Sequence, residues 1–127
     1  MKSILPLIIA VLILLSGCAG PSAENGYHQI SQEEAKSMMD SQEVVTLDVR
    51  EQDEYDGGHI PGAVLLPVGT IDQDTAAAVI PEKDTAVLVY CRSGNRSKTA
   101  SSALAALGYT NIYEFGGINT WPYDIVK

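Results

Sequence analysis

Cys91 is the best candidate for a nucleophile in this sequence. It follows an apolar run at residues 86–90 and precedes a helix-forming segment. Where a strand runs through a short loop into a helix, the loop lies at the carboxyl end of the sheet, and open α/β folds bind ligands there. The helix N-terminus adds unpaired N–H groups and a partial positive charge, which both favour a thiolate. The candidate substrate-binding loop consists of Arg92, Ser93, Gly94, Asn95 and Arg96.

The charge of this loop contrasts with that of the whole chain. Arg92 and Arg96 are two of only eight Lys and Arg residues, against sixteen Asp and Glu, and the net charge is −8. Two guanidinium groups beside a helix end should lower the pKa of the Cys91 thiol below its ordinary value and attract a small anion. Gly94 is expected to permit a tight or positive-φ conformation. The alternative is a buried structural cysteine between solvated arginines.

Length and composition limit the classes of function. The 127 residues fit one domain, and 46% hydrophobic with 19% charged residues is a globular balance. An acidic chain is a poor candidate for binding nucleic acid, because phosphate contacts need clustered Lys and Arg. The two cysteines, Cys18 and Cys91, cannot build a disulfide framework. Together with two distant histidines they do not suggest a metal site either.

The N-terminus has the pattern of an export signal. Lys2 precedes a twelve-residue apolar run at 4–15, which is shorter than the ~20 residues of a membrane-spanning helix and fits a secretory signal peptide. The run ends in Leu-Ser-Gly-Cys, which resembles the lipobox of bacterial lipoproteins, where the signal is cut before the cysteine and its sulfur is lipidated. This resemblance implies a signal peptide at 1–17 and a lipid anchor on Cys18.

The lipobox resemblance also implies a location. The protein would be exported and lipid-anchored to a bacterial membrane, on its periplasmic or extracellular face. Residues 18–26 are small, polar and turn-forming, and are expected to be a flexible linker. Lipidation of Cys18 would leave Cys91 as the only free thiol of the mature chain. An ordinary cleaved signal and a short uncleaved anchor are the alternatives.

Predicted strands and helices alternate along residues 27–127. The run at 86–90 is apolar throughout, which is typical of a central parallel strand covered on both faces. Alternation of this kind predicts a single α/β domain with a mostly parallel sheet flanked by helices. Strands are expected at 27–30, 44–49, 63–66, 86–90 and 111–115. Helices are expected at 31–39, 51–55, 70–79, 97–107 and 118–126. Ser31 and Glu34 form a capping box that opens the first of these helices, either Thr70 or Asp72 could cap the third, and an amphipathic pattern supports the fourth.

The sequence CRSGNRS at 91–97 resembles the active-site loop of the rhodaneses, the thiosulfate sulfurtransferases. Other motifs of that family follow in its order, and together they extend from about Tyr27 to the C-terminus. The resemblance implies a single-domain rhodanese-like fold with a five-stranded, mostly parallel sheet flanked by helices. After Trp121 the sequence PYDIVK replaces the segment with which the family often continues. The matching motifs are DVR at 48–50, EY at 54–55, GHIPGA at 58–63 and GGI at 116–118.

The rhodanese resemblance implies a reaction. The Cys91 thiolate would attack the outer sulfur of thiosulfate, release sulfite and become a persulfide, from which cyanide or a small thiol takes the sulfur. Arg92 and Arg96 would position the donor. No metal or organic cofactor is required, and a monomer is expected.

The other motif residues are expected to be structural. Arg50 and Glu54 are four residues apart and could form an ion pair. Asp48 ends a strand beside the carboxyl edge of the sheet. His59 is expected to hold the glycine-rich corner, the segment GHIPGA at 58–63, by hydrogen bonding. Sulfur transfer requires no acid–base step from any of these four side chains.

Three other functions are considered. Rhodanese-related cysteine phosphatases have five residues between Cys and Arg, whereas Arg96 comes one position earlier, which should suit a sulfur atom better than a phosphate ester. Mercaptopyruvate-type loops resemble CGSG followed by small uncharged residues, whereas this loop carries two arginines. The third is a non-catalytic or sulfur-carrying module tethered at the membrane.

Overall fold

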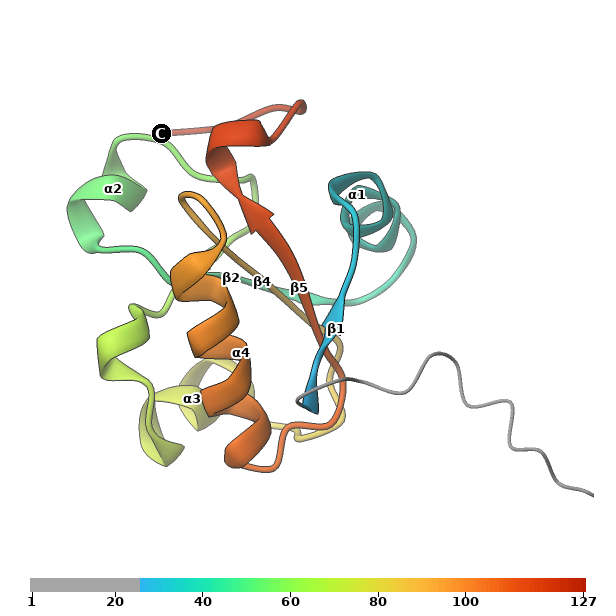
Figure 1. Cartoon of the computed structure of the whole chain (residues 1–127), viewed down its shortest axis with the longest axis vertical. Helices are drawn as coiled ribbons and strands as arrows, with labels where there is room; N and C mark the ends of the chain where they lie inside the picture. Colours follow the sequence, from blue (N-terminus) through green and yellow to red (C-terminus); the bar gives the residue numbers. More distant parts are fainter. Residues whose placement is uncertain (1–25) are drawn as a thin grey trace, which may run out of the picture.

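Five strands form one sheet in the order β1-β5-β4-β2-β3, with β4 at its centre (Figure 1). The computed structural model describes residues 26–127, so the predicted signal peptide, Cys18 and most of the linker lie outside the described residues. Every strand pair is parallel, which confirms the predicted sheet. The strands are β1 (His28–Gln29), β2 (Val45–Asp48), β3 (Val64–Leu65), β4 (Val87–Cys91) and β5 (Ile112–Gly117).

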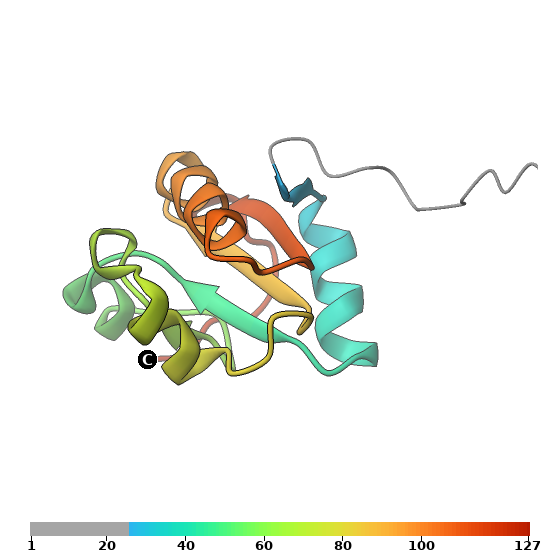
Figure 2. The ribbon, with the colours of Figure 1, turned by 90° about the horizontal axis from the view of Figure 1, so that it is seen from below.

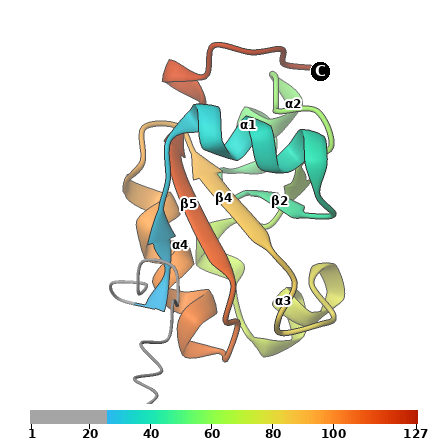
Figure 3. The same ribbon diagram turned by 90° about the vertical axis from the view of Figure 1, so that its right-hand side faces the viewer.

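Helices cover both faces of this sheet (Figures 2 and 3). One face is covered by α1, and the other by α3 and α4, so the strands form the middle of three layers. None of the helices within residues 26–127 combines the length and the apolar character that a bilayer crossing needs. The helices are α1 (Gln32–Ser41), α2 (Gln52–Asp56), α3 (Gln73–Val79) and α4 (Asn95–Ala106), with 3-10 turns η2 (Val68–Thr70) and η3 (Ile118–Thr120).

The apolar strand β4 takes part in both hydrophobic cores. Successive side chains of a strand point to opposite faces of the sheet. Val89 therefore belongs to the core beneath α4, together with Leu104, and Tyr90 belongs to the core beneath α1, together with Ala35. Full burial of one such apolar side chain stabilises a fold by ~1.5–3 kcal/mol. Packing on both faces fixes β4 in place, and with it Cys91 at its end.

Helix α4 begins earlier than the sequence pattern predicts. The amphipathic pattern suggested residues 97–107, but the helix runs over Asn95–Ala106. Gly94 precedes it with φ of 105°, a left-handed conformation that a side chain would strain. Asn95 and Arg96 consequently belong to the first turn of α4 rather than to the loop.

The starts of two other helices follow from capping side chains. Ser31 Oγ accepts from the backbone N–H of Glu34 at 3.0 Å, and the Glu34 carboxylate accepts from the backbone N–H of Ser31, so the predicted capping box of α1 is present. Asp72 caps α3 by accepting from two backbone N–H groups. The residues before this cap form the separate turn η2, so the helix predicted from residue 70 is shorter than expected.

The closing helix predicted at 118–126 is wrong. Only η3 forms, because Pro122 has no N–H to donate and disfavours a helical conformation at the residue before it. Trp121 accordingly has ψ of 116°. Beyond it the chain runs back to the glycine-rich corner, where Val126 and His59 exchange two backbone hydrogen bonds of 2.8 Å.

Candidate active site

Cys91 is the last residue of the central strand, and its side chain faces α4. The sequence placed it at the first position of the loop, but the strand continues one residue further. The thiol is almost fully enclosed, with 1% of the residue exposed. Its Sγ accepts a hydrogen bond of 3.1 Å from the backbone N–H of Gly94 and lies 3.4 Å from Ser97 Oγ in the first turn of α4.

The surroundings of Cys91 favour its anionic form. Burial alone would raise the pKa of the Cys91 thiol, but hydrogen bonds outweigh it. In the thiolate form these come from the Ser97 hydroxyl and from the backbone N–H groups of Ser97, Gly94 and Ser93. The pKa of Cys91 therefore lies below its ordinary value, as the sequence predicted. The N–H groups of the loop were among the predicted causes, whereas the hydroxyl was not.

The loop at 92–94 folds tightly against the end of β5. A side-chain carbon on Gly117 would collide with the carbonyl oxygen of Arg92. The same oxygen accepts a hydrogen bond of 3.1 Å from the backbone N–H of Asn119. The strand register shifts between Val89 and Cys91, where the chain leaves the regular ladder. Gly117 is therefore required for the loop to close over the cysteine.

Arg96 is held by an acidic residue of a different helix. Its guanidinium donates to both carboxylate oxygens of Glu54 in α2, at 2.6 and 2.9 Å. The hydrogen bond from Arg96 lowers the pKa of the Glu54 carboxyl to about 2. The Arg50–Glu54 ion pair expected from their spacing does not form, because both partners have closer ones. Arg96 thus sits beside the cysteine loop with its charge already compensated.

Arg50 pairs with Asp48 inside the protein. The Arg50 guanidinium donates to Asp48 Oδ2 at 2.7 Å and to the carbonyl of Gly58 at 2.7 Å. Tyr90 donates its hydroxyl to the same Asp48 oxygen at 2.7 Å and accepts from the backbone N–H of Ile60 at 3.1 Å. Burial lowers the pKa of Arg50, but hydrogen bonding to Asp48 outweighs it and the pKa is raised. This buried network ties the glycine-rich corner to the end of β2.

His59 also stabilises that corner. Its Nδ1 donates to the carbonyl oxygen of Tyr55 at 3.0 Å, and its ring stacks on the Tyr55 ring with 3.8 Å between centroids. None of the hydrogen bonds found for its ring reaches the cysteine loop. The contacts of His59 are therefore those of a structural residue.

A cavity of about 420 Å³ opens beside the loop. Arg92 contributes its exposed side chain to this cavity and forms no ion pair with any of the described residues. Asp53 of α2 and two apolar residues, Ile118 and Ile125, also line it. Glu54, which pairs with Arg96, lines it as well. An anion entering here would meet in Arg92 a guanidinium that no described carboxylate holds in an ion pair. Residues 26–127 contain no cluster of three His, Cys, Asp or Glu side chains that could hold a metal ion.

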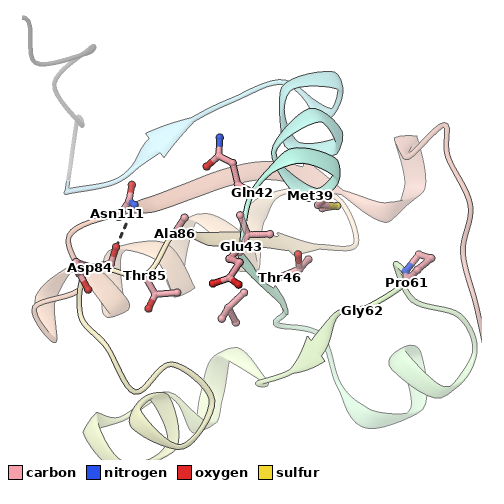
Figure 4. Close-up of a pocket in the computed structure, with 12 residues that line it drawn as sticks. Met39, Gln42, Glu43, Thr46, Pro61, Gly62, Asp84, Thr85, Ala86 and Asn111 are labelled. Carbon is pink, nitrogen blue, oxygen red and sulfur yellow. Dashed lines mark hydrogen bonds between the residues drawn. The ribbon is translucent and has the colours of Figure 1, made fainter.

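Figure 4 shows a second cavity, of about 930 Å³, at the opposite edge of the sheet. It lies between the end of α1 and the starts of β2 and β4, with Gln42, Glu43 and Asp84 among its polar residues. Its lining contains neither a cysteine nor a basic residue. Cys91 lies at the carboxyl end of β4, where parallel sheets bind ligands, so this cavity is separate from the cysteine site.

Besides the Ser97 hydroxyl, one residue of the site was not anticipated from the sequence. Glu114 of β5 is 3% exposed, and its Oε2 accepts from Ser97 Oγ at 2.6 Å and from the backbone N–H of Gly116 at 2.7 Å. A signal was present, since Glu114 is the single charged residue in the predicted strand at 111–115. Its position beside the cysteine depends on tertiary packing.

Comparisons with known proteins agree with this fold. A family model described as "Rhodanese-like domain" matches residues 31–122. The chain is 34% identical over 96 residues to "Thiosulfate sulfurtransferase GlpE" of Coxiella burnetii, covering 75% of this chain and 87% of that protein. It is 36% identical over 81 residues to "Thiosulfate sulfurtransferase PspE" of Escherichia coli, covering 64% and 77%. A solved structure described as "rhodanese with anions from E. coli" superposes with a TM-score of 0.62 at 30% identity, covering 67% and 99%.

Proposed function

Because this chain belongs to the rhodanese-like family, we propose that it is a sulfurtransferase that carries sulfane sulfur on Cys91. The observation that carries this proposal is the environment of the Cys91 sulfur. Hydrogen bonds from Gly94 and Ser97 lower the pKa of this thiol at the carboxyl end of a parallel sheet. The relatives named thiosulfate sulfurtransferases make thiosulfate the preferred donor.

The reaction has two steps. The Cys91 thiolate attacks the outer sulfur of thiosulfate, a new S–S bond forms, and the bond to the sulfonate sulfur breaks as sulfite leaves with its electron pair. Cys91 then carries a persulfide. In the second step cyanide or a thiol attacks the terminal sulfur, and the thiolate of Cys91 is regenerated. The loop N–H groups that surround Sγ offer hydrogen bonds to the negative charge that moves between these sulfur atoms.

The two arginines have different roles in this proposal. Arg92 attracts the dianionic donor, because it lines the adjacent cavity and forms no ion pair with any described residue. Arg96 orients the first turn of α4 through its pair with Glu54. The donor-positioning role predicted for both arginines is thus assigned mainly to Arg92.

Export and lipid anchoring form a separate part of the proposal. Their support is the apolar run at 4–15 followed by Leu-Ser-Gly-Cys. With Cys18 lipidated, the transfer reaction takes place at a membrane surface outside the cytoplasm. The acceptor then belongs to that compartment.

Intact-mass measurement of the purified protein after exposure to thiosulfate tests the transfer reaction. The wild type is expected to gain one sulfur atom, which cyanide or a reducing thiol removes. Cys91→Ser is the matched control and should gain none. If the wild type takes up no sulfur from any sulfane donor, the tethered non-catalytic module is the better account.

The same preparation separates sulfur transfer from phosphate chemistry. Turnover is expected with thiosulfate and cyanide, and none with an aryl phosphate. The reason is that Arg96 comes one position earlier than in the phosphatase loop. Phosphatase turnover that disappears in Cys91→Ser would assign the loop to ester hydrolysis instead.

A further inference from the structure

Glu114 is a buried carboxylate without a cationic partner. No lysine, arginine or histidine among residues 26–127 forms an ion pair with it. Its Oε2 accepts from Ser97 Oγ and from the backbone N–H of Gly116, and its Oε1 accepts from Gln29 Nε2 at 3.4 Å. Burial of a carboxylate is unfavourable, and an apolar side chain would suit this strand better. The carboxylate therefore calls for a functional explanation.

Ser97 connects Glu114 to the cysteine. The Cys91 thiol donates to Ser97 Oγ at 3.4 Å, and the Ser97 hydroxyl donates to Glu114 Oε2 at 2.6 Å. A hydroxyl has one hydrogen, and its short bond to the carboxylate assigns that hydrogen to Glu114. All three residues are buried, so bulk water has little access to this chain of hydrogen bonds.

We propose that Glu114 accepts the proton of the Cys91 thiol through Ser97. The S–H bond breaks and its proton passes to Ser97 Oγ, while the hydrogen of Ser97 passes to Glu114 Oε2. The electron pair stays on sulfur, so the site carries one negative charge before and after the transfer. Glu114 does not touch the donor and is a positioning residue that acts through Ser97; this inference rests on the proposed function.

Sharing one proton has an electrostatic benefit. A thiolate next to an ionised carboxylate would put two negative charges in a buried site and would repel a dianionic donor. Transfer of the proton to Glu114 leaves a thiolate beside a neutral carboxylic acid. The Ser97 hydroxyl is then free to donate to the thiolate, as the loop N–H groups already do.

Few other groups can disturb this pair. From α4 the charged Lys98 lines a cavity of about 430 Å³ that Glu114 also lines, but no ion pair joins them. From β1 and the start of α1, the lining residues are neutral. From β4 the titratable group on this face is Cys91 itself. The Arg96 guanidinium of α4 also acts electrostatically on Cys91, although it is paired with Glu54. The pH dependence of alkylation at Cys91 should therefore reflect the Cys91–Glu114 pair.

The pH dependence of alkylation by iodoacetamide tests the proposal on the full chain. In the wild type, the Cys91–Glu114 pair holds one proton over a range of pH below the midpoint of Cys91 deprotonation. Over that range, proton transfer between the two groups fixes the fraction of thiolate. The alkylation rate should therefore level off to a plateau that does not depend on pH. Glu114→Gln cannot accept the proton, and its rate should fall about tenfold per pH unit without a plateau. Glu114→Leu, whose apolar side chain suits a buried strand position, also removes the carboxylate and should likewise lack the plateau. Lys98→Met is the control and should retain it.

Two results would overturn the proposal. One is a wild-type profile without a plateau, and the other is a plateau that persists in Glu114→Gln or, if that variant does not fold, in Glu114→Leu. Sulfur uptake measured alongside keeps the proposed function separate. A plateau without sulfur uptake in the wild type would support the relay and contradict the sulfurtransferase. Sulfur uptake that is about 10²-fold slower in Glu114→Gln than in the wild type, at a pH below the wild-type midpoint, is the expected catalytic consequence.

Discussion

Glu54 and Arg96 lie 42 positions apart in the sequence, and their side chains form a two-pronged ion pair in the folded protein. The pair joins α2 to the first turn of α4, immediately after the loop that encloses Cys91. The positive charge of Arg96 is therefore neutralised by Glu54 and serves to hold α2 and α4 together. Arg92 lies two residues before Gly94, where the chain turns into α4. It forms no ion pair with any of the described residues.

Arg92→Gln is expected to raise the KM for thiosulfate about 10- to 100-fold with little change in kcat. Loss of one charge-assisted contact of ~1.5–3 kcal/mol has this effect. Arg96→Gln and Glu54→Gln should resemble each other, because each breaks the same pair. Steady-state kinetics of the three variants, with the surface variant Lys36→Gln as control, measures the difference. A KM increase in Arg96→Gln that Glu54→Gln does not share would show Arg96 in contact with the donor.

The Glu54–Arg96 pair should also affect stability as a function of pH. The pKa of Glu54 in the folded protein is about 2, below the ordinary value of 4.5. A lowered folded-state pKa stabilises the fold above the ordinary value, and this contribution disappears as pH falls from about 4.5 to about 2. Denaturant unfolding of wild type and Glu54→Gln should show a difference in unfolding free energy that is constant near neutrality and shrinks over this interval. A difference that is unchanged at pH 2 would contradict it.

Gly117→Ala should disrupt the cysteine loop. The new methyl group would collide with the carbonyl of Arg92, so the loop must move away from the end of β5. We expect loss of sulfur uptake and a lower melting temperature. Gly69→Ala is the matched control, because its added carbon meets nothing within 4 Å and the residue has no positive φ. Equal activity in the two variants would mean that the loop tolerates displacement.

Cys18→Ala should block lipid labelling in a bacterial host and release the protein or stall it as a precursor. The reason is that the apolar run and Leu-Ser-Gly-Cys specify modification at that sulfur. Metabolic labelling with a fatty acid and membrane fractionation provide the measurement. Continued membrane attachment with residues 1–17 still present would instead identify an uncleaved anchor.

Local patterns predicted most of the fold. The apolar run ending at Tyr90 identified the central strand, and Ser31 with Glu34 identified the start of α1, because both signals lie within a few residues. The closing helix failed because Pro122 interrupts it. The spacing of Arg50 and Glu54 predicted an ion pair that does not form, because Arg50 pairs with the buried carboxylate of Asp48 instead.

Contacts between residues far apart in the sequence could not be predicted from local patterns. Ser97 lies on α4 and Glu114 on β5, and only the packing of that helix on the sheet brings them within 2.6 Å. The spacing of Ser97 and Glu114 in the sequence does not indicate that their side chains are in contact. The sequence could therefore propose the cysteine as the reacting group, whereas it could not point to the residue proposed to take its proton.

Helix α4 also sets the orientation of the site with respect to the start of the domain. Gly26, where the described chain begins, lies against Ala105 in the last turn of α4, whereas Cys91 lies against Ser97 in its first turn. The two turns are about 12 Å apart along the helix axis, at a rise of about 1.5 Å per residue. The point where the predicted linker joins the domain and the cysteine loop therefore lie towards opposite ends of α4, so attachment of the domain through Gly26 leaves the approach to Cys91 unobstructed.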